Sequence, residues 1–168
     1  MTFSIVASNP STKELCVATS TGLVAVGNLV PSILPNVGAI CVQAMMKPSY
    51  RETILDLMKK DSSNESAINH VLKNDKKKEH RQIIVVNAKG QCYIFSGQKT
   101  IAISDSCRGD YFSIAADIQP RLSPPAFSPA INVNKSRLGK KTFELFRNVV
   151  FIEEITEVEA SMLPAIEK

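Results

Sequence analysis

The stretch QIIVVNAKGQCYIFS, residues 82–96, indicates the fold most directly. Two runs rich in apolar, β-branched and aromatic residues flank the segment Ala-Lys-Gly at residues 88–90. Such side chains suit the pleated, half-buried surface of a sheet. A short glycine-containing segment between two such runs is typical of a β-hairpin. The chain is therefore expected to contain antiparallel sheet.

Three runs earlier in the chain have the same strand-like composition. Residues 2–7 (TFSIVA) and 14–19 (ELCVAT) stand on either side of an Asn-Pro-Ser-Thr segment. Because those residues favour a turn, the two runs predict a second hairpin. Residues 38–44 (GAICVQA) are nearly all apolar, as expected for a strand that is covered on both faces. Before them, Pro31 and Pro35 bracket a segment that we expect to be a loop at or outside the sheet edge.

Two consecutive helices are predicted after residue 48. Ser49 and Glu52, and then Ser62 and Glu65, have the spacing of a capping box, in which both side chains bond to free amide groups at a helix start. Each pair precedes apolar residues at the spacing of one buried helix face. Strands, two helices and further strands in this order suit two antiparallel sheets with helices on an outer face.

The second half of the chain is less regular. Residues 100–116 contain two strand candidates, which we expect to be separated by a turn at residues 106–109. Residues 119–129 include four prolines, too many for regular structure. Beyond them, residues 142–147 predict a helix, and residues 149–152 predict a strand for which a helix remains the alternative.

Much of the net charge of +4 comes from the lysine-rich segment KNDKKKEHR, residues 73–81. Such a run between a helix and a strand is expected to be a solvated connector. Patches that bind nucleic acid interleave arginine with stacking aromatic side chains, so we expect no nucleic-acid partner. His70 and His80 lack a third ligand at usable spacing. We therefore expect no metal site, and without a cofactor-binding motif we expect no cofactor.

The four cysteines, Cys16, Cys41, Cys92 and Cys107, form no C-x-x-C pair. The first three lie in apolar runs, where free cysteine behaves as a small buried hydrophobe. Cys107 lies in a more polar segment and is the best candidate for a reactive thiol. The pattern is typical of a reducing compartment. Without a secretory signal or an apolar stretch of about 18 residues, we expect a cytoplasmic protein that does not enter a membrane.

The order of these segments resembles one protein family. TFSIVA, an Asn-Pro turn, ELCVATS, AVGNLVP, VGAICVQA, KPSY and, after the two helices, RQIIVVNAKGQCYIFSG follow one another as in the domain-of-unknown-function family 1028. The resemblance implies a single α+β domain over residues 1–168, with a family-like core at residues 1–116 and a divergent, proline-containing tail at residues 117–168. It also implies the four-layer αββα sandwich of the N-terminal nucleophile hydrolases, which the shorter C-terminal part would leave incomplete.

The resemblance implies a specific chemistry for Thr2. In N-terminal nucleophile hydrolases the first residue of the mature chain attacks an amide carbonyl, and its own α-amine serves as the base. Removal of Met1 would expose Thr2 in that position. Ser20, Gln43 and Tyr50 are the candidates for binding an unknown small-molecule or peptide-like substrate. From the residues alone, each of the four also suits a purely structural place in a strand or helix.

Two departures from the family pattern keep other functions open. Thr21 stands where the family commonly has a basic residue, and the family's NPxYG segment appears as KPSYR, residues 47–51. The main alternative is a catalytically inactive member that binds a small molecule or assembles as an oligomer. A further alternative is a structural subunit whose shortened sheet is completed by another copy. Whichever of these functions holds, we expect a homo-oligomer.

Overall fold

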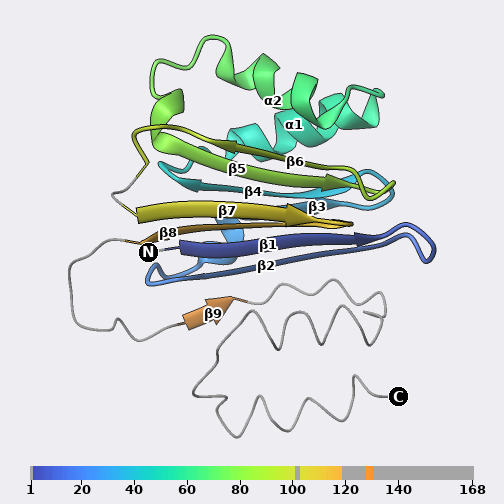
Figure 1. The fold of residues 1–168 in the computed structure, drawn as a ribbon, viewed down its shortest axis with the longest axis horizontal. Coiled ribbons are helices and arrows are strands. Elements are labelled where there is room, and N and C mark those ends of the chain that lie inside the picture. The colour runs from blue at the N-terminus through green and yellow to red at the C-terminus, as the bar shows by residue number, and fades with distance from the viewer. Residues whose placement is uncertain (1, 101–102, 119–127, 131–168) are drawn as a thin grey trace, which may run out of the picture. The chain divides into compact units, whose positions relative to one another are not determined.

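Two antiparallel β-sheets and two α-helices form the part of the chain that the computed structural model describes, namely residues 2–100, 103–118 and 128–130 (Figure 1). In chain order the strands are β1 (Thr2–Asn9), β2 (Glu14–Thr21), β3 (Pro31–Leu34), β4 (Gly38–Ala44), β5 (Arg81–Asn87), β6 (Cys92–Ser96), β7 (Ile103–Gly109), β8 (Phe112–Ile118) and β9 (Ser128–Ala130). The helices are α1 (Ser49–Lys59) and α2 (Asn64–Leu72), with two short 3₁₀ turns, η1 (Val26–Asn28) and η2 (Lys78–His80).

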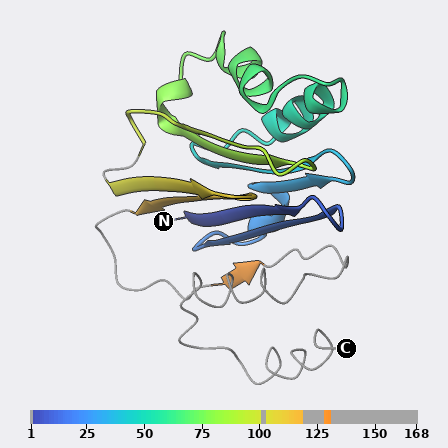
Figure 2. The same cartoon turned by 45° about the vertical axis from the view of Figure 1, so that its right-hand side comes forward.

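The two sheets are stacked, and both α-helices cover the outer face of the smaller sheet (Figures 1 and 2). The larger sheet has the strand order β7-β8-β1-β2-β9 and the smaller one β3-β4-β5-β6. All neighbouring strands are antiparallel, and β1–β2 and β5–β6 are the two predicted hairpins. The structure therefore confirms the α+β class. No helix in the described ranges is both long and apolar enough to cross a membrane.

The turn between β5 and β6 shows why this hairpin was predictable. The side-chain oxygen of Asn87 accepts hydrogen bonds from the main-chain nitrogens of Lys89 (3.0 Å) and Gln91 (2.9 Å), which closes the turn as asparagine commonly does. Gly90 has a φ of +82°, in the region that favours glycine. A Cβ at this position would lie 2.2 Å from the ring of Tyr111. Both local geometry and packing therefore require glycine here.

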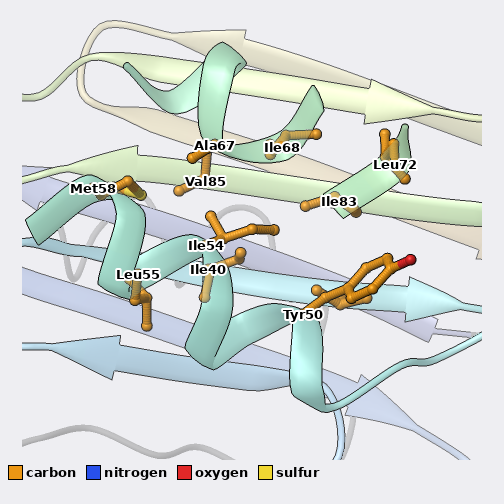
Figure 3. Close-up of a cluster of buried hydrophobic side chains, with 11 residues drawn as sticks. Ile40, Tyr50, Ile54, Leu55, Met58, Ala67, Ile68, Leu72, Ile83 and Val85 are labelled. Carbon is orange, nitrogen blue, oxygen red and sulfur yellow. The ribbon is translucent and has the colours of Figure 1, made fainter. Parts of the chain in front are cut away.

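The helices pack on the smaller sheet through one apolar cluster (Figure 3). Ile54 of α1 and Ile68 of α2 are fully buried in it. Burying one aliphatic side chain of this size contributes about 1.5–3 kcal/mol, so the cluster is a main source of stability for the helix layer. Its other buried members are Ile40, Val42, Tyr50, Leu55, Met58, Ala67, Leu72, Ile83 and Val85.

The helix starts differ from the predicted capping boxes. In α1 the cap position is occupied by Pro48, and Ser49 already belongs to the helix and makes no side-chain cap. In α2 the cap is Ser63 rather than Ser62, and its hydroxyl accepts a hydrogen bond from the nitrogen of Ser66 (3.1 Å). Neighbouring serines offer the same group one position apart. Which of them caps the helix therefore depends on how the helix packs, which sequence spacing does not encode.

Three segments that we predicted to be irregular contain edge strands. Residues 106–109 belong to β7, and the turn follows them at Asp110 and Tyr111. Polar residues on an exposed edge strand resemble a turn in sequence, which explains the error. β3 and β9 are edge strands too, and their prolines are tolerated there because an edge leaves some amide positions unpaired. The structures predicted for residues 119–127 and 142–152 lie outside the described residues.

A buried ion pair fastens the chain where it returns from α2 to β5. The guanidinium Nε of Arg81 donates to Asp75 Oδ2 (2.5 Å), and each side chain is only 6% exposed. The hydroxyl of Tyr50 donates to the same carboxylate oxygen (2.8 Å), and Arg81 also donates to the carbonyl of Met45 just after β4. The lysines around Asp75 are exposed, as predicted for a solvated connector.

We expect Asp75→Asn to lower the free energy of unfolding by about 3 kcal/mol at neutral pH, because it leaves the buried Arg81 without a counter-charge. The hydrogen bond from Arg81 holds the pKa of Asp75 well below its usual range. The stabilisation is therefore complete above the unfolded-state pKa of about 3.9 and is lost as the pH falls below it.

Denaturant unfolding of the wild type and Asp75→Asn between pH 7 and pH 3 measures this effect. The difference in unfolding free energy between the two proteins should narrow as the pH drops. Asp56→Asn, at an exposed helix position, should have nearly the unfolding free energy of the wild type at every pH. A constant difference over that range would contradict the assignment.

Candidate functional site

Strand alternation divides the space between the sheets into an apolar centre and a polar end. In the centre, Val6, Val17 and Ile84 belong to a buried cluster drawn from both sheets. Where β1 and β5 begin and β2, β4 and β8 end, near the label N in Figure 1, the inward-facing positions are polar. We call this group the Thr2 cluster; it consists of Thr2, Ser4, Thr19, Thr21, Gln43, Gln82 and Asp117.

Strand pairing positions Thr2 between two polar neighbours. It lies opposite Thr21 on β2 and opposite Asp117 on β8. Residues two apart on a strand share a face, so Ser4 follows on the same inward side, where its hydroxyl lies 3.0 Å from that of Thr19. Three adjacent strands of the larger sheet thus contribute oxygen-bearing side chains to one end of the interior.

The main-chain nitrogen of Thr2 donates a hydrogen bond to the carboxylate of Asp117, at 2.5 Å from Oδ1. Asp117 is 1% exposed and Thr2 is 9% exposed. The hydroxyl oxygen of Thr2 lies 3.4 Å from the hydroxyl of Thr21. A buried carboxylate therefore faces the nitrogen that would become the chain's amino group if Met1 were removed.

Two glutamines of the smaller sheet link Thr2 to β6 and β7, which are the edge strands of the smaller and the larger sheet. Nε2 of Gln43, on β4, donates to Gln82 Oε1 (2.7 Å) and to the carbonyl oxygen of Thr2 (3.4 Å). Nε2 of Gln82, on β5, donates to Ser96 Oγ (3.1 Å) and to the carbonyl oxygen of Asp105 (3.2 Å). Both glutamines are fully buried. Oε1 of Gln43 has no hydrogen-bond partner in the described part of the chain.

The buried thiols are unsuited to nucleophilic chemistry. Cys41 lies 3.5 Å from the hydroxyl of Thr19 at the border of the Thr2 cluster. Burial raises its pKa to about 12, and burial likewise raises the pKa of Cys16 to about 12. Since the thiolate is the reactive form, both remain protonated thiols at neutral pH. Cys107 is exposed on β7, and Cys92 is partly buried rather than a full core residue.

The structure brings together two of the four predicted site residues. Thr2 and Gln43 meet between the sheets. Ser20 pairs with Phe3 and points to the other face of the larger sheet, since Thr21 next to it points inward. Tyr50 lies on α1, on the helix-covered side of the smaller sheet. Neither Ser20 nor Tyr50 therefore shares a surface with Thr2.

Sequence reasoning missed Asp117 and Gln82 as members of the site. We placed Asp117 at the start of an irregular tail, although Ser113, Ala115 and Asp117 have the alternation of one inward strand face. Gln82 opens the apolar run of β5 and stands out only as a polar residue on a covered strand. These two signals could have identified both positions, but not the residues that they contact.

The described residues around Thr2 do not form a metal-binding geometry. In residues 2–100, 103–118 and 128–130, no three His, Cys, Asp or Glu side chains lie together in an arrangement that could hold a metal ion. The groups around Thr2 are instead a carboxylate, hydroxyls and carboxamides, which bind hydrogen-bonding organic ligands or water.

Comparison with known proteins identifies the family. The model of a family of unknown function, DUF1028, matches residues 2–121. The fold resembles the crystal structure of protein SPO2555 from Silicibacter pomeroyi, which carries the same family model, with a TM-score of 0.66 and 28% identity over 70% of this chain and 52% of that one. This chain thus spans about half the length of that protein. The comparison with curated proteins found no significant match. With most of its length matched in sequence, the chain belongs to the DUF1028 family.

Proposed function

We propose that the protein is an N-terminal nucleophile amidohydrolase in which Thr2, exposed by removal of Met1, is the nucleophile. One observation carries the proposal: the main-chain nitrogen of Thr2 is held by the buried carboxylate of Asp117, while its hydroxyl faces the polar end of the interior. Nucleophile, amine and orienting group then lie together, which this mechanism requires.

The reaction would proceed through an acyl-enzyme. The hydroxyl oxygen of Thr2 attacks the substrate carbonyl carbon, and its proton passes to the α-amine of the same residue, directly or through a water. The C–N bond then breaks, and the amine returns the proton to the leaving nitrogen. A water molecule hydrolyses the resulting ester, which releases the acid and restores Thr2.

Asp117 would position the amine and set the pH at which it works. An α-amine has an ordinary pKa of about 7.7–8.0. A carboxylate at hydrogen-bond distance favours the protonated form, so we expect the pKa of the Thr2 amine to lie above that range. The base is the unprotonated amine, and activity should therefore rise toward alkaline pH.

The proposal includes the four-layer αββα sandwich of this hydrolase class. The described residues supply two stacked sheets and one helix layer in support of it (Figure 2). Ligand binding without catalysis is the second candidate function. The fully buried oxygen of Gln43, to which no residue in the described ranges donates, favours it. A homo-oligomer, an amide substrate and a cytoplasmic location stay predictions.

Untagged protein is expected to begin at Thr2, which intact mass and N-terminal sequencing would check. A β-lactone probe should then form an ester with the Thr2 hydroxyl, because ring opening needs the same attack as amide cleavage. Thr2→Ala should abolish the adduct and Thr2→Ser should retain it. Thr12→Ala, at an exposed turn position, is the matched control. Retained Met1, or an adduct that survives Thr2→Ala, would rule out the mechanism.

Asp117→Asn is expected to move the pH profile of adduct formation toward acid by about one pH unit. The substitution keeps an oxygen that accepts from the Thr2 nitrogen but removes the charge that favours the protonated amine. Rates of lactone acylation between pH 6 and pH 10 would measure the shift, with Asp110→Asn in the exposed β7–β8 turn as the control. An unchanged midpoint would show that Asp117 does not act on the base.

A further inference from the structure

We propose that the Thr2 cluster selects ligands that donate an N–H group, such as primary or N-monosubstituted carboxamides, and that Oε1 of Gln43 is the acceptor. The inference names the substrate class of the proposed hydrolase site and in that sense rests on the proposed function. The preference for N–H-donating ligands, however, depends only on the hydrogen bonds of the described residues and not on catalysis.

Fixed acceptors at both ends of the glutamine pair set the orientation of both amides. The main-chain carbonyl of Asp105 can only accept, so Gln82 must turn Nε2 toward it (3.2 Å). Gln82 Oε1 then faces Gln43, which must present its own Nε2 there (2.7 Å). The carbonyl of Thr2 accepts from the same Nε2 (3.4 Å) and reinforces this orientation. Turning either amide around would place two acceptors face to face.

Among the hydrogen bonds that the described residues make, the oxygen of Gln43 is therefore the one group of the pair left without a partner. It is fully buried, and no described residue donates to it. An unsatisfied buried acceptor is destabilising, and buried polar groups are nearly always paired with protein, water or ligand. The orientation is set before any ligand arrives, so the acceptor is preorganised.

The surroundings favour a donor over an anion or an ester. Asp117 brings a carboxylate to the same cluster, and Thr2 and Thr21 bring hydroxyl oxygens. A carboxylate ligand would be repelled by Asp117. An ester has no donor for Gln43, and a site built to bond an N–H discriminates strongly against an analogue that lacks it. A carboxamide satisfies the acceptor and also carries the carbonyl that Thr2 would attack.

The test is a binding comparison by NMR on the full chain, with hexanamide and methyl hexanoate as probes. Their alkyl tails suit the exposed apolar side chains of Leu23, Val24 and Met45, which lie two or three residues beyond Thr21 and Gln43. Hexanamide should shift the side-chain amide signals of Gln43 saturably and bind at least about tenfold more tightly than the ester, as expected for one lost hydrogen bond.

Gln43→Met removes the acceptor at similar size and should abolish the preference for the amide, whereas Gln98→Met, at an exposed position, should retain it. If Gln43→Met fails to fold, the comparison of the two probes on the wild type decides alone. Equal binding of amide and ester, or no saturable shift at Gln43, would overturn the inference and leave its oxygen to a bound water.

The outcome is separable from that of the hydrolase proposal. Selective amide binding by a protein that retains Met1 would end the catalytic proposal and keep this one. An adduct on Thr2 together with equal binding of amide and ester would end this inference and keep the catalytic proposal.

Discussion

The hydrogen bond between the Thr2 nitrogen and the buried carboxylate of Asp117 is the interaction on which the functional account depends. It joins β1 to β8 through two residues that are 115 positions apart in the sequence. It exists because antiparallel pairing puts the two residues opposite one another with both side chains turned inward. The same alternation that builds the apolar centre from Val6 and Val17 thus delivers a carboxylate to the start of the chain.

The concentration of buried polar side chains at one end of the interior is the strongest argument for function. Aliphatic side chains at the positions of Gln43 and Gln82 would pack the sheets together without polar atoms to satisfy. The chain instead buries two carboxamides, a carboxylate and several hydroxyls there, and the described residues leave the oxygen of one carboxamide, that of Gln43, without a hydrogen-bond partner. Buried polar networks that are only partly satisfied cost stability, and such exceptions to good packing concentrate at functional sites.

Sequence patterns predicted what is local and missed what depends on distant contacts. The β5–β6 hairpin follows from two strand-like runs joined by a turn, and the turn geometry is encoded by Asn87 and Gly90 themselves. The partner of Thr2 could not be found this way, because nothing near Thr2 in sequence indicates Asp117. Tyr50 was assigned to a site from its position at a helix start, yet packing turned it toward Asp75 on the other side of the smaller sheet. The helices were recognised from their apolar faces, while their caps were set by tertiary packing.

The central claim concerns a single nitrogen, and its titration can be observed directly. In protein labelled with ¹⁵N at threonine, the account predicts an α-amine signal from Thr2 that titrates above the ordinary range of about 7.7–8.0. A signal that titrates within or below that range would contradict it. So would an amide signal in place of an amine, since the nitrogen would then still be bonded to Met1.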